Sequence, residues 1–402
     1  MILKDQLERI AASQKEWLYP KSRQVKREII DQFRHKQPYI HIITGIRRCG
    51  KSTLLQQLME LYKRPVYFNF EDHRAYNFEI GDFEKLDQIF DQQKPDAWFF
   101  DEIQNVSGWE RYIRSARDRG RTIFLTGSNA TLLSRELGTK LTGRHLTHVL
   151  YPFSYREFLN YKNVEPSVET FKDFMSTGGF PEYIKNEEIG ILQQLLEDVM
   201  MRDVIVRYEI RQEEILKALT LFLISNSGKE FSYNKLSKRF RTGSVNTIIN
   251  YIGFLANSYL FFTLPLFSSS IKRQLANPKK VFAVDTGLIK ANTLSFSDDL
   301  GRILETIVYI ELCRCKKEIF YHRSEYECDF VVKDSANQLQ AIQVCYELDN
   351  DNLEREINGI KELDPFSFTE KIIITLNQKD LFGDIRVLPV WQWLIEKNDG
   401  RG

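Results

Sequence analysis

One octapeptide constrains the fold of this chain more than any other feature. Residues 45–52 have the sequence Gly-Ile-Arg-Arg-Cys-Gly-Lys-Ser and satisfy every fixed position of the phosphate-binding pattern G-x-x-x-x-G-K-[ST]. A short apolar run at 38–44 precedes the octapeptide, and 53–62 has helical spacing after it. This order of strand, loop and helix predicts an α/β fold built on a P-loop that binds a nucleotide.

The residue types in the loop match the chemistry of polyphosphate binding. Gly45 and Gly50 permit backbone conformations and a close approach that would let successive amides point at the α- and β-phosphates. Lys51 would bridge the β- and γ-phosphates, and the Ser52 hydroxyl would complete the shell of a Mg²⁺ ion. The alternative is a glycine-rich turn without a ligand, which the flanking elements disfavour. We therefore expect a nucleotide and Mg²⁺ as ligands, held by Gly45, Arg48, Cys49, Gly50, Lys51, Ser52 and Thr53. The sequence has no Asn-Lys-x-Asp pattern of the kind that reads guanine, which favours ATP over GTP.

A second motif predicts hydrolysis in addition to binding. Residues 94–102 have the pattern of a buried strand and end in two adjacent carboxylates, Asp101 and Glu102. Asp101 would hold Mg²⁺, and Glu102 would polarise the attacking water. An isolated Asp-Glu pair is more often an ordinary acidic strand end, but this pair follows a P-loop and its helix.

Two more strands fit around these motifs. Residues 64–72 and 121–129 each have a strand pattern, and the second ends in the small polar residues Ser128 and Asn129. An extra strand between the loop strand and the Asp-Glu strand is the layout of AAA+ ATPases. Ser128 or Asn129 would then sense the γ-phosphate and orient water, unless this strand end simply faces solvent.

Several stretches together resemble a widespread bacterial and archaeal family of AAA+ ATPases whose members carry a C-terminal domain similar to restriction endonucleases. Besides the motifs above, they are Leu-Thr-Gly-Arg at 141–144, Tyr-Pro-Phe-Ser-Tyr-Arg-Glu-Phe at 151–158, Gly-Gly-Phe-Pro-Glu at 178–182 and Arg-Asp-Val at 202–204. The resemblance implies that Arg144 is a finger stabilising charge on the γ-phosphate, within or between subunits. A surface arginine on a polar turn is the alternative.

Length and composition limit the remaining classes of function. A chain of 402 residues suits two or three domains, and 56 basic against 55 acidic residues give a net charge of +1. No global field therefore attracts nucleic acid or membrane. The five cysteines form no C-x-x-C pair, and the most apolar stretch, 259–267, has only nine residues. We expect a cytoplasmic protein without a membrane segment, made of an AAA+ core at 1–154, a helical lid at 155–227, a winged helix at 228–290 and a small α/β nuclease-like domain at 291–402.

The expected winged helix carries a local basic excess. Helices are predicted at 232–240 and 244–255, followed by a hairpin at 259–285. Residues 229–242 contain five basic residues and one acid, and Lys272, Arg273, Lys279 and Lys280 mark the hairpin. This excess favours phosphate contacts with DNA, although a winged helix used only for packing is the alternative.

The C-terminal region has the element order of the restriction-endonuclease fold but not its complete chemistry. Glu305 or Glu311 and Asp329 fit the carboxylate positions of such a site, whereas the Glu-x-Lys position contains Gln343-Val-Cys345. Gln has no charge and Cys cannot replace an ammonium, so we expect a degenerate domain. The leading hypothesis is an ATPase that moves or switches its other domains. A slow nucleotide-dependent switch for a protein partner or a further copy of the chain is the alternative, and an active DNA nuclease is the least favoured.

Overall fold

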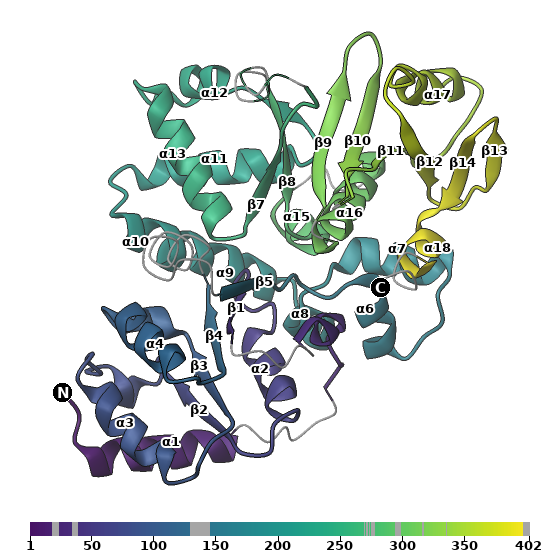
Figure 1. The fold of residues 1–402 in the computed structure, drawn as a ribbon. Helices are drawn as coiled ribbons and strands as arrows, with labels where there is room; N and C mark the ends of the chain where they lie inside the picture. The colour runs from purple at the N-terminus through teal and green to yellow at the C-terminus, as the bar shows by residue number, and fades with distance from the viewer. Residues whose placement is uncertain are drawn as a thin grey trace. The chain divides into compact units, whose positions relative to one another are not determined.

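The computed structural model describes residues 1–17, 24–33, 39–128, 145–268, 270, 272, 274, 278–293, 299–315, 317–334 and 336–396. The chain divides into two compact units, Met1–Tyr151 and Pro152–Gly402 (Figure 1). Among the helices of the described residues, none is both long enough and apolar enough to cross a membrane.

The first unit is built on a parallel five-stranded sheet. Its strands lie in the order β2-β3-β4-β1-β5, so that β3 and β4 separate β2 from β1. Every residue of β1, β3 and β4 is buried, as expected for parallel strands covered on both faces. The α/β fold predicted from the P-loop is confirmed, and the sheet is typical of an AAA+ core. The strands are β1 (Ile40–Thr44), β2 (Pro65–Asn69), β3 (Ala97–Asp101), β4 (Ile123–Gly127) and β5 (His145–Val149).

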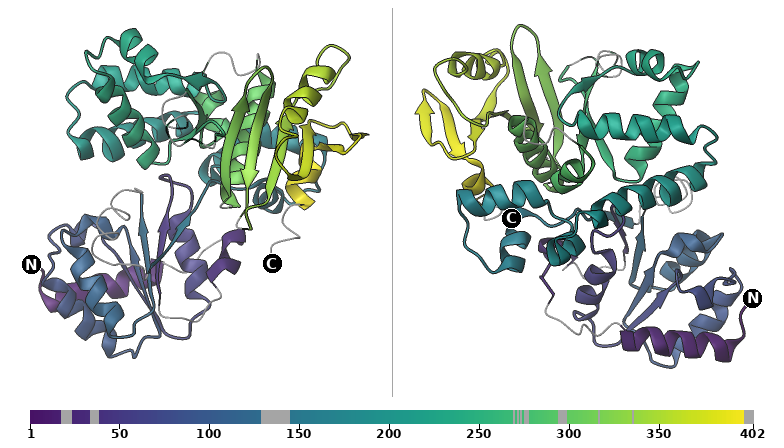
Figure 2. Two further views of the ribbon diagram at one scale, coloured as in Figure 1. Left: turned by 45° about the horizontal axis from the view of Figure 1, so that its top comes forward. Right: turned by 180° about the vertical axis from the view of Figure 1, so that it is seen from behind.

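Helices cover both faces of this sheet (Figure 2). Helices α1 (Lys4–Trp17), α3 (Asp82–Asp91) and α4 (Trp109–Asp118) bury their apolar faces with the sheet in one aromatic-rich core. Helix α2 (Lys51–Met59), which follows the P-loop, lies on the opposite face and buries Leu54, Leu55 and Leu58. Three short 3-10 turns complete the unit: η1 (Glu28–Phe33), η2 (His73–Ala75) and η3 (Ile103–Asn105).

The strand register brings the motifs of the first unit to one edge of the sheet. Thr44 at the end of β1 lies beside Gly127 at the end of β4. Phe100 in β3 pairs with Leu125 in β4, so the residues that follow, Asp101 and Thr126, meet at the same edge. Because the strands are parallel, their carboxyl ends form one crevice in which a ligand can bind.

The second unit begins with helices, as the spacing at 155–223 predicts. The chain remains helical through a π-helical segment, η4 (Val199–Ile205), which links α9 to the short helix α10. The helices are α6 (Tyr155–Lys162), α7 (Val168–Thr177), α8 (Pro181–Asn186), α9 (Gly190–Asp198), α10 (Val206–Tyr208) and α11 (Glu213–Ser225).

A three-stranded antiparallel sheet follows in the order β6-β8-β7. Its strands are β6 (Glu230–Phe231), β7 (Phe261–Leu264) and β8 (Lys279–Ala283), and α12 (Tyr233–Phe240) and α13 (Val245–Asn257) lie between β6 and β7 in the chain. Both helices and the hairpin strands β7 and β8 thus form where the sequence predicts them.

The last part of the chain forms a mixed six-stranded sheet in the order β13-β14-β12-β11-β10-β9. Strands β9, β10 and β11 are antiparallel neighbours, whereas β11, β12 and β14 run parallel. The strands are β9 (Glu318–Arg323), β10 (Glu327–Lys333), β11 (Leu339–Val344), β12 (Phe368–Thr375), β13 (Asp380–Phe382) and β14 (Ile385–Pro389). The accompanying helices are α15 (Thr286–Asn292), α16 (Leu300–Arg314), α17 (Leu353–Lys361) and α18 (Val390–Glu396).

Candidate active site

The two glycines of the P-loop occupy positions that another residue would strain. Gly45 has φ +144°, and a Cβ there would lie 2.1 Å from the carbonyl oxygen of Leu150. Gly50 has φ +99° directly before α2, and a Cβ there would lie 3.1 Å from Nη1 of Arg27. Residues with a side chain rarely adopt either backbone conformation, so the shape of the loop requires glycine at both positions.

Lys51 lies inside the loop at the first residue of α2. Its side chain is buried, and Nζ donates to the carbonyl oxygens of Gly45 (3.1 Å) and Ile46 (3.3 Å). The same Nζ is 4.0 Å from Oε1 of Glu102. Ser52 is exposed on the first turn of α2. The loop therefore places one ammonium group and the amino end of a helix together, which suits an anionic ligand.

The acidic pair at the end of β3 is held by residues of both neighbouring strands. Asp101 is buried, and its carboxylate accepts hydrogen bonds from the Tyr67 hydroxyl (3.0 Å) and from the Thr126 hydroxyl. Burial and the adjacent Asp101 raise the pKa of Tyr67, so this hydroxyl remains a proton donor. The structure thus fixes the orientation of the carboxylate expected to hold Mg²⁺.

Glu102 directly follows β3, and the backbone changes direction at this residue. It has φ +51°, its amide donates to Oγ1 of Thr126 (2.9 Å), and its carboxylate accepts from the Gln104 amide. A left-handed conformation is uncommon for a residue with a side chain and is found where surrounding contacts enforce it. Here the hydroxyl of Thr126 bonds both members of the acidic pair.

Arg27 is a site residue that the sequence did not reveal. Its guanidinium is buried and donates to the carbonyl oxygens of Cys49 (2.8 Å) and Tyr151 (2.7 Å). It therefore ties the P-loop to the segment that follows β5. From its place before the first strand, the segment from Tyr19 to Arg27 is a candidate for adenine contacts, and Tyr19 and Pro20 lie outside the described residues.

The structure describes some of the remaining predicted site residues and not others. Ser128 is buried directly after β4, whereas Asn129 and Arg144 lie outside the described residues. Arg48 is exposed with φ +63° and Thr53 is half-buried. Cys49 is fully buried, and burial raises the pKa of its thiol. Cys49 therefore contributes to the loop through its backbone, whose carbonyl oxygen accepts from Arg27.

Comparisons of the sequence with known proteins identify the family. A family model described as an AAA domain matches residues 37–159. An uncharacterized protein of Methanocaldococcus jannaschii is 35% identical over 394 residues, covering 88% of each chain. An uncharacterized protein of Haemophilus influenzae is 30% identical over 387 residues, covering 89% of this chain and 94% of the relative. The chain belongs to this family of AAA-domain proteins. A domain of unknown function, DUF8612, matches residues 168–299.

Solved structures similar to this AAA-domain protein include DnaA and Cdc6p. AMPPCP-bound DnaA from Aquifex aeolicus is 16% identical with a TM-score of 0.27, covering 57% of this chain and 85% of that one. Cdc6p from Pyrobaculum aerophilum is 11% identical with a TM-score of 0.24, covering 76% of this chain and 93% of that one. The family assignment rests on the two sequence relatives.

We expect Thr126→Val to weaken the site without changing its shape. Valine is similar in size but cannot donate to Asp101 or accept from the Glu102 amide, so a buried carboxylate and an amide each lose a partner. The Mg²⁺ concentration for half-maximal ATP hydrolysis should rise by about 10–100-fold, as for other residues that orient metal ligands. The matched control is Thr220→Val in the second unit, because Thr220 is equally buried and donates to the Leu216 carbonyl oxygen. An unchanged Mg²⁺ dependence in Thr126→Val would contradict the assigned role.

The second unit contains a buried cluster of carboxylates around one lysine. Nζ of Lys280 in β8 lies 2.8 Å from Oε1 of Glu305 in α16, 3.0 Å from Oδ1 of Asp329 and 2.6 Å from Oε1 of Glu327 in β10. The Lys280 side chain is only 4% exposed, so the predicted phosphate contact in the hairpin is wrong for this residue. Arg273, predicted for the same role, lies outside the described residues.

The charges of this cluster explain its titration. Burial alone would lower the pKa of Lys280, but the three carboxylates outweigh it and hold that pKa well above the ordinary value. Burial raises the pKa of Glu305, and this effect exceeds the lowering caused by Lys280. Asp329 and Glu327 raise the pKa further, since three carboxylates share one ammonium group. Within the described residues, no group of three or more His, Cys, Asp or Glu side chains could hold a metal ion. Lys280 supplies the positive charge of this cluster.

The structure distinguishes the two glutamates that the sequence left open. Glu305 faces Asp329 across Lys280, whereas Glu311 is 3.3 Å from Nε of Arg314. Gln343 accepts from the Asp329 amide (3.1 Å) and donates to Oε2 of Glu356 (2.5 Å). Cys345 is buried, and burial raises its pKa to about 11, so its thiol is not a nucleophile near neutral pH.

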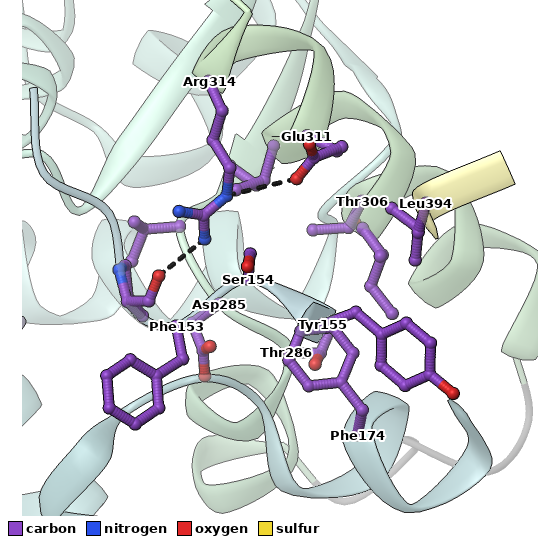
Figure 3. Close-up of a pocket in the computed structure, with 14 residues that line it drawn as sticks. Phe153, Ser154, Tyr155, Phe174, Asp285, Thr286, Thr306, Glu311, Arg314 and Leu394 are labelled. Carbon is purple, nitrogen blue, oxygen red and sulfur yellow. Dashed lines mark hydrogen bonds and ion pairs between the residues drawn. The ribbon is translucent and has the colours of Figure 1, made fainter. Parts of the chain in front are cut away.

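A pocket elsewhere in the second unit explains the Gly-Gly-Phe-Pro motif (Figure 3). It lies between α6, α15 and α16, and Asp285, Glu311 and Arg314 are among the residues that line it. Asp285 accepts from the amides of Gly179 (2.6 Å) and Leu288 (3.1 Å), and burial raises its pKa to about 6. A Cβ at Gly178 would lie 2.2 Å from this carboxylate. The protein itself satisfies these groups, so the motif is structural.

Proposed function

We propose that this AAA-domain protein binds ATP with Mg²⁺ and hydrolyses it at the P-loop edge of the first unit. The observation that carries the proposal is the meeting of Lys51 and Glu102 at 4.0 Å, with Asp101 beside Glu102 at the end of β3. A lysine of the loop and two carboxylates at the end of a separate strand are the groups that phosphoryl transfer to water requires.

Each group has a role that follows from its chemistry. Lys51 would exchange its bonds to the Gly45 and Ile46 carbonyl oxygens for phosphate oxygens and neutralise charge on them. Glu102 would orient a water molecule and accept its proton, while Ser128 or Asn129 would hold the same water or the γ-phosphate. Arg144 would stabilise charge in the transition state, from the same or a neighbouring subunit.

The donor set fits Mg²⁺. A carboxylate and a hydroxyl are hard oxygen ligands, and Mg²⁺ prefers one or two such groups together with phosphate oxygens and water. Asp101 and Ser52 would supply them, with Thr126 and Tyr67 holding the carboxylate. When bound, the metal would neutralise charge on the β- and γ-phosphates.

We further propose identities for the parts of the second unit. Residues 155–227, which include helices α6 to α11, would form the lid of the ATPase, residues 228–290 a winged helix, and residues 291–402 a nuclease-like domain without nuclease activity. We expect no nuclease activity because Lys280 fills the space between Glu305 and Asp329 and because Gln343 is uncharged. ATP turnover would change the arrangement of these parts.

The test is phosphate release from ATP by the full chain, measured with Mg²⁺ and with a chelator. Hydrolysis that requires Mg²⁺ and is competed by ADP supports the proposal. Nucleotide binding without turnover above that of a Glu102→Gln variant would instead support a nucleotide-dependent switch that acts by assembly. Failure to bind ATP at all would overturn both.

A further inference from the structure

The segment from Phe231 to Val284 contains no acidic residue. It has eight lysines and arginines in 54 residues, whereas the average composition of the chain would give it about seven acids. The chain as a whole has a net charge of only +1, so this segment is a concentrated positive region. One of the eight, Lys280, is buried by carboxylates and does not contribute to the surface.

The surface charge gathers on α12 and the turn after it. Lys235, Lys238, Arg239 and Arg241 are all exposed, and none of them has a carboxylate partner among the described residues. Arg239 lies over the ring of Phe222, 4.6 Å from its centroid, which holds one guanidinium at the surface. Unpaired, exposed basic side chains on one short helix favour an anionic partner over a structural role.

Helix α13 presents a different kind of face beside this charge. It packs on α12 by burying Ile248, Ile252 and other apolar residues, and it contains no charged residue. Its exposed residues Asn246, Ile249 and Asn250 have the i, i+3, i+4 spacing of one helix face. Asparagine bonds adenine edges and an aliphatic side chain contacts the thymine methyl, so this face suits base edges.

We propose that α12 and α13 form a docking surface for double-stranded DNA, with the basic residues on phosphates and the α13 face in the major groove. The inference rests on the interpretation of residues 228–290 as a winged helix, proposed above, and it does not require ATP hydrolysis. The major groove of B-form DNA admits a helix, whereas that of A-form RNA is too narrow. Single-strand binding uses exposed aromatic platforms, and no fully exposed aromatic residue lies between residues 233 and 250.

The experiment measures binding of the full chain to a labelled, mixed-sequence 25-base-pair duplex by fluorescence anisotropy, across a salt series and without nucleotide. The variant replaces Lys238, Arg239 and Arg241 by Gln. Each lost phosphate contact should reduce the slope of log affinity against log salt by roughly 0.9, and affinity near 0.1 M salt should fall at least about 10-fold.

The matched control replaces three exposed lysines elsewhere in the same unit, Lys172, Lys185 and Lys379, by Gln. It makes the same change in net charge, so it should retain the affinity and the salt slope of the native chain. Equal loss in both triple variants would overturn the proposal, as would preferential binding of RNA or single-stranded DNA, or no duplex binding at low salt. Duplex binding retained in Lys51→Ala would separate this surface from the ATPase site.

Sequence reading is tested separately with Asn246→Ala/Asn250→Ala. Selection from a randomised duplex pool should enrich a preferred sequence for the native chain. The double variant should lose that preference while its affinity for mixed-sequence DNA changes little, because phosphate contacts remain. A preference that persists unchanged would show that the α13 face does not lie against the bases.

Discussion

Replacing Glu102 by Gln should leave ATP binding nearly unchanged and reduce turnover by about 10²–10⁴-fold. Glutamine keeps the shape of the side chain and an oxygen that can accept from Gln104, but it cannot take a proton from water. The backbone that positions it is held by the Thr126 hydroxyl, 2.9 Å from the Glu102 amide, and is not altered by the substitution. The measurement is single-turnover hydrolysis together with equilibrium binding of a fluorescent ATP analogue.

Lys51→Ala is the comparator that separates binding from chemistry. The alanine variant loses the ammonium group that the loop holds within 3.1 Å of the Gly45 carbonyl oxygen, so ATP affinity itself should fall, by roughly 10–100-fold. Turnover by Glu102→Gln equal to that of the native chain would remove Glu102 from the mechanism. Unchanged nucleotide affinity in Lys51→Ala would place the phosphates elsewhere.

The sequence predicted the first unit well because its signals are local. The P-loop glycines, the apolar strands and the carboxylates at the end of β3 each follow from neighbouring residues, and the parallel sheet brings their ends together. Many helices and strands of the second unit were also predicted, because helical spacing and short apolar runs determine them, but β6, α15, β13, β14 and α18 were not.

Contacts between residues far apart in the chain could not be predicted from one sequence. Arg27 reaches the carbonyl oxygen of Tyr151, and the Thr126 hydroxyl reaches Asp101 in the neighbouring strand, but neither residue belongs to a motif. For Lys280, a long-range contact instead overturned a prediction. The sequence predicted an exposed phosphate contact beside Lys279, but side chains alternate along β8 and that of Lys280 points into the carboxylate cluster.

This burial predicts a large effect for Lys280→Met. The variant would leave the carboxylates of Glu305 and Asp329 without their ammonium partner, while Glu327 would keep Arg323, whose Nη1 lies 3.8 Å from its Oε2. Removing one partner from a buried ion pair costs about 3–5 kcal/mol, and we expect a loss of that size in the free energy of unfolding of the second unit. Lys279→Met is the matched control, because its half-buried side chain lies on the other face of the same strand and forms no ion pair with described residues.

The pH dependence of this loss distinguishes electrostatics from packing. Without the ammonium, the folded variant binds protons at this cluster more readily than the folded native chain does, because the carboxylates lose the cation that favours their charged form. Stability of Lys280→Met should therefore rise as pH falls from about 8 towards 4.5, and its difference from the native chain should narrow. The lysine itself has a pKa raised in the folded state, so it stays charged throughout this range and its contribution to the native chain is constant. Denaturant unfolding at several pH values measures the difference, and an equal loss at every pH would mean that Lys280 acts through packing alone.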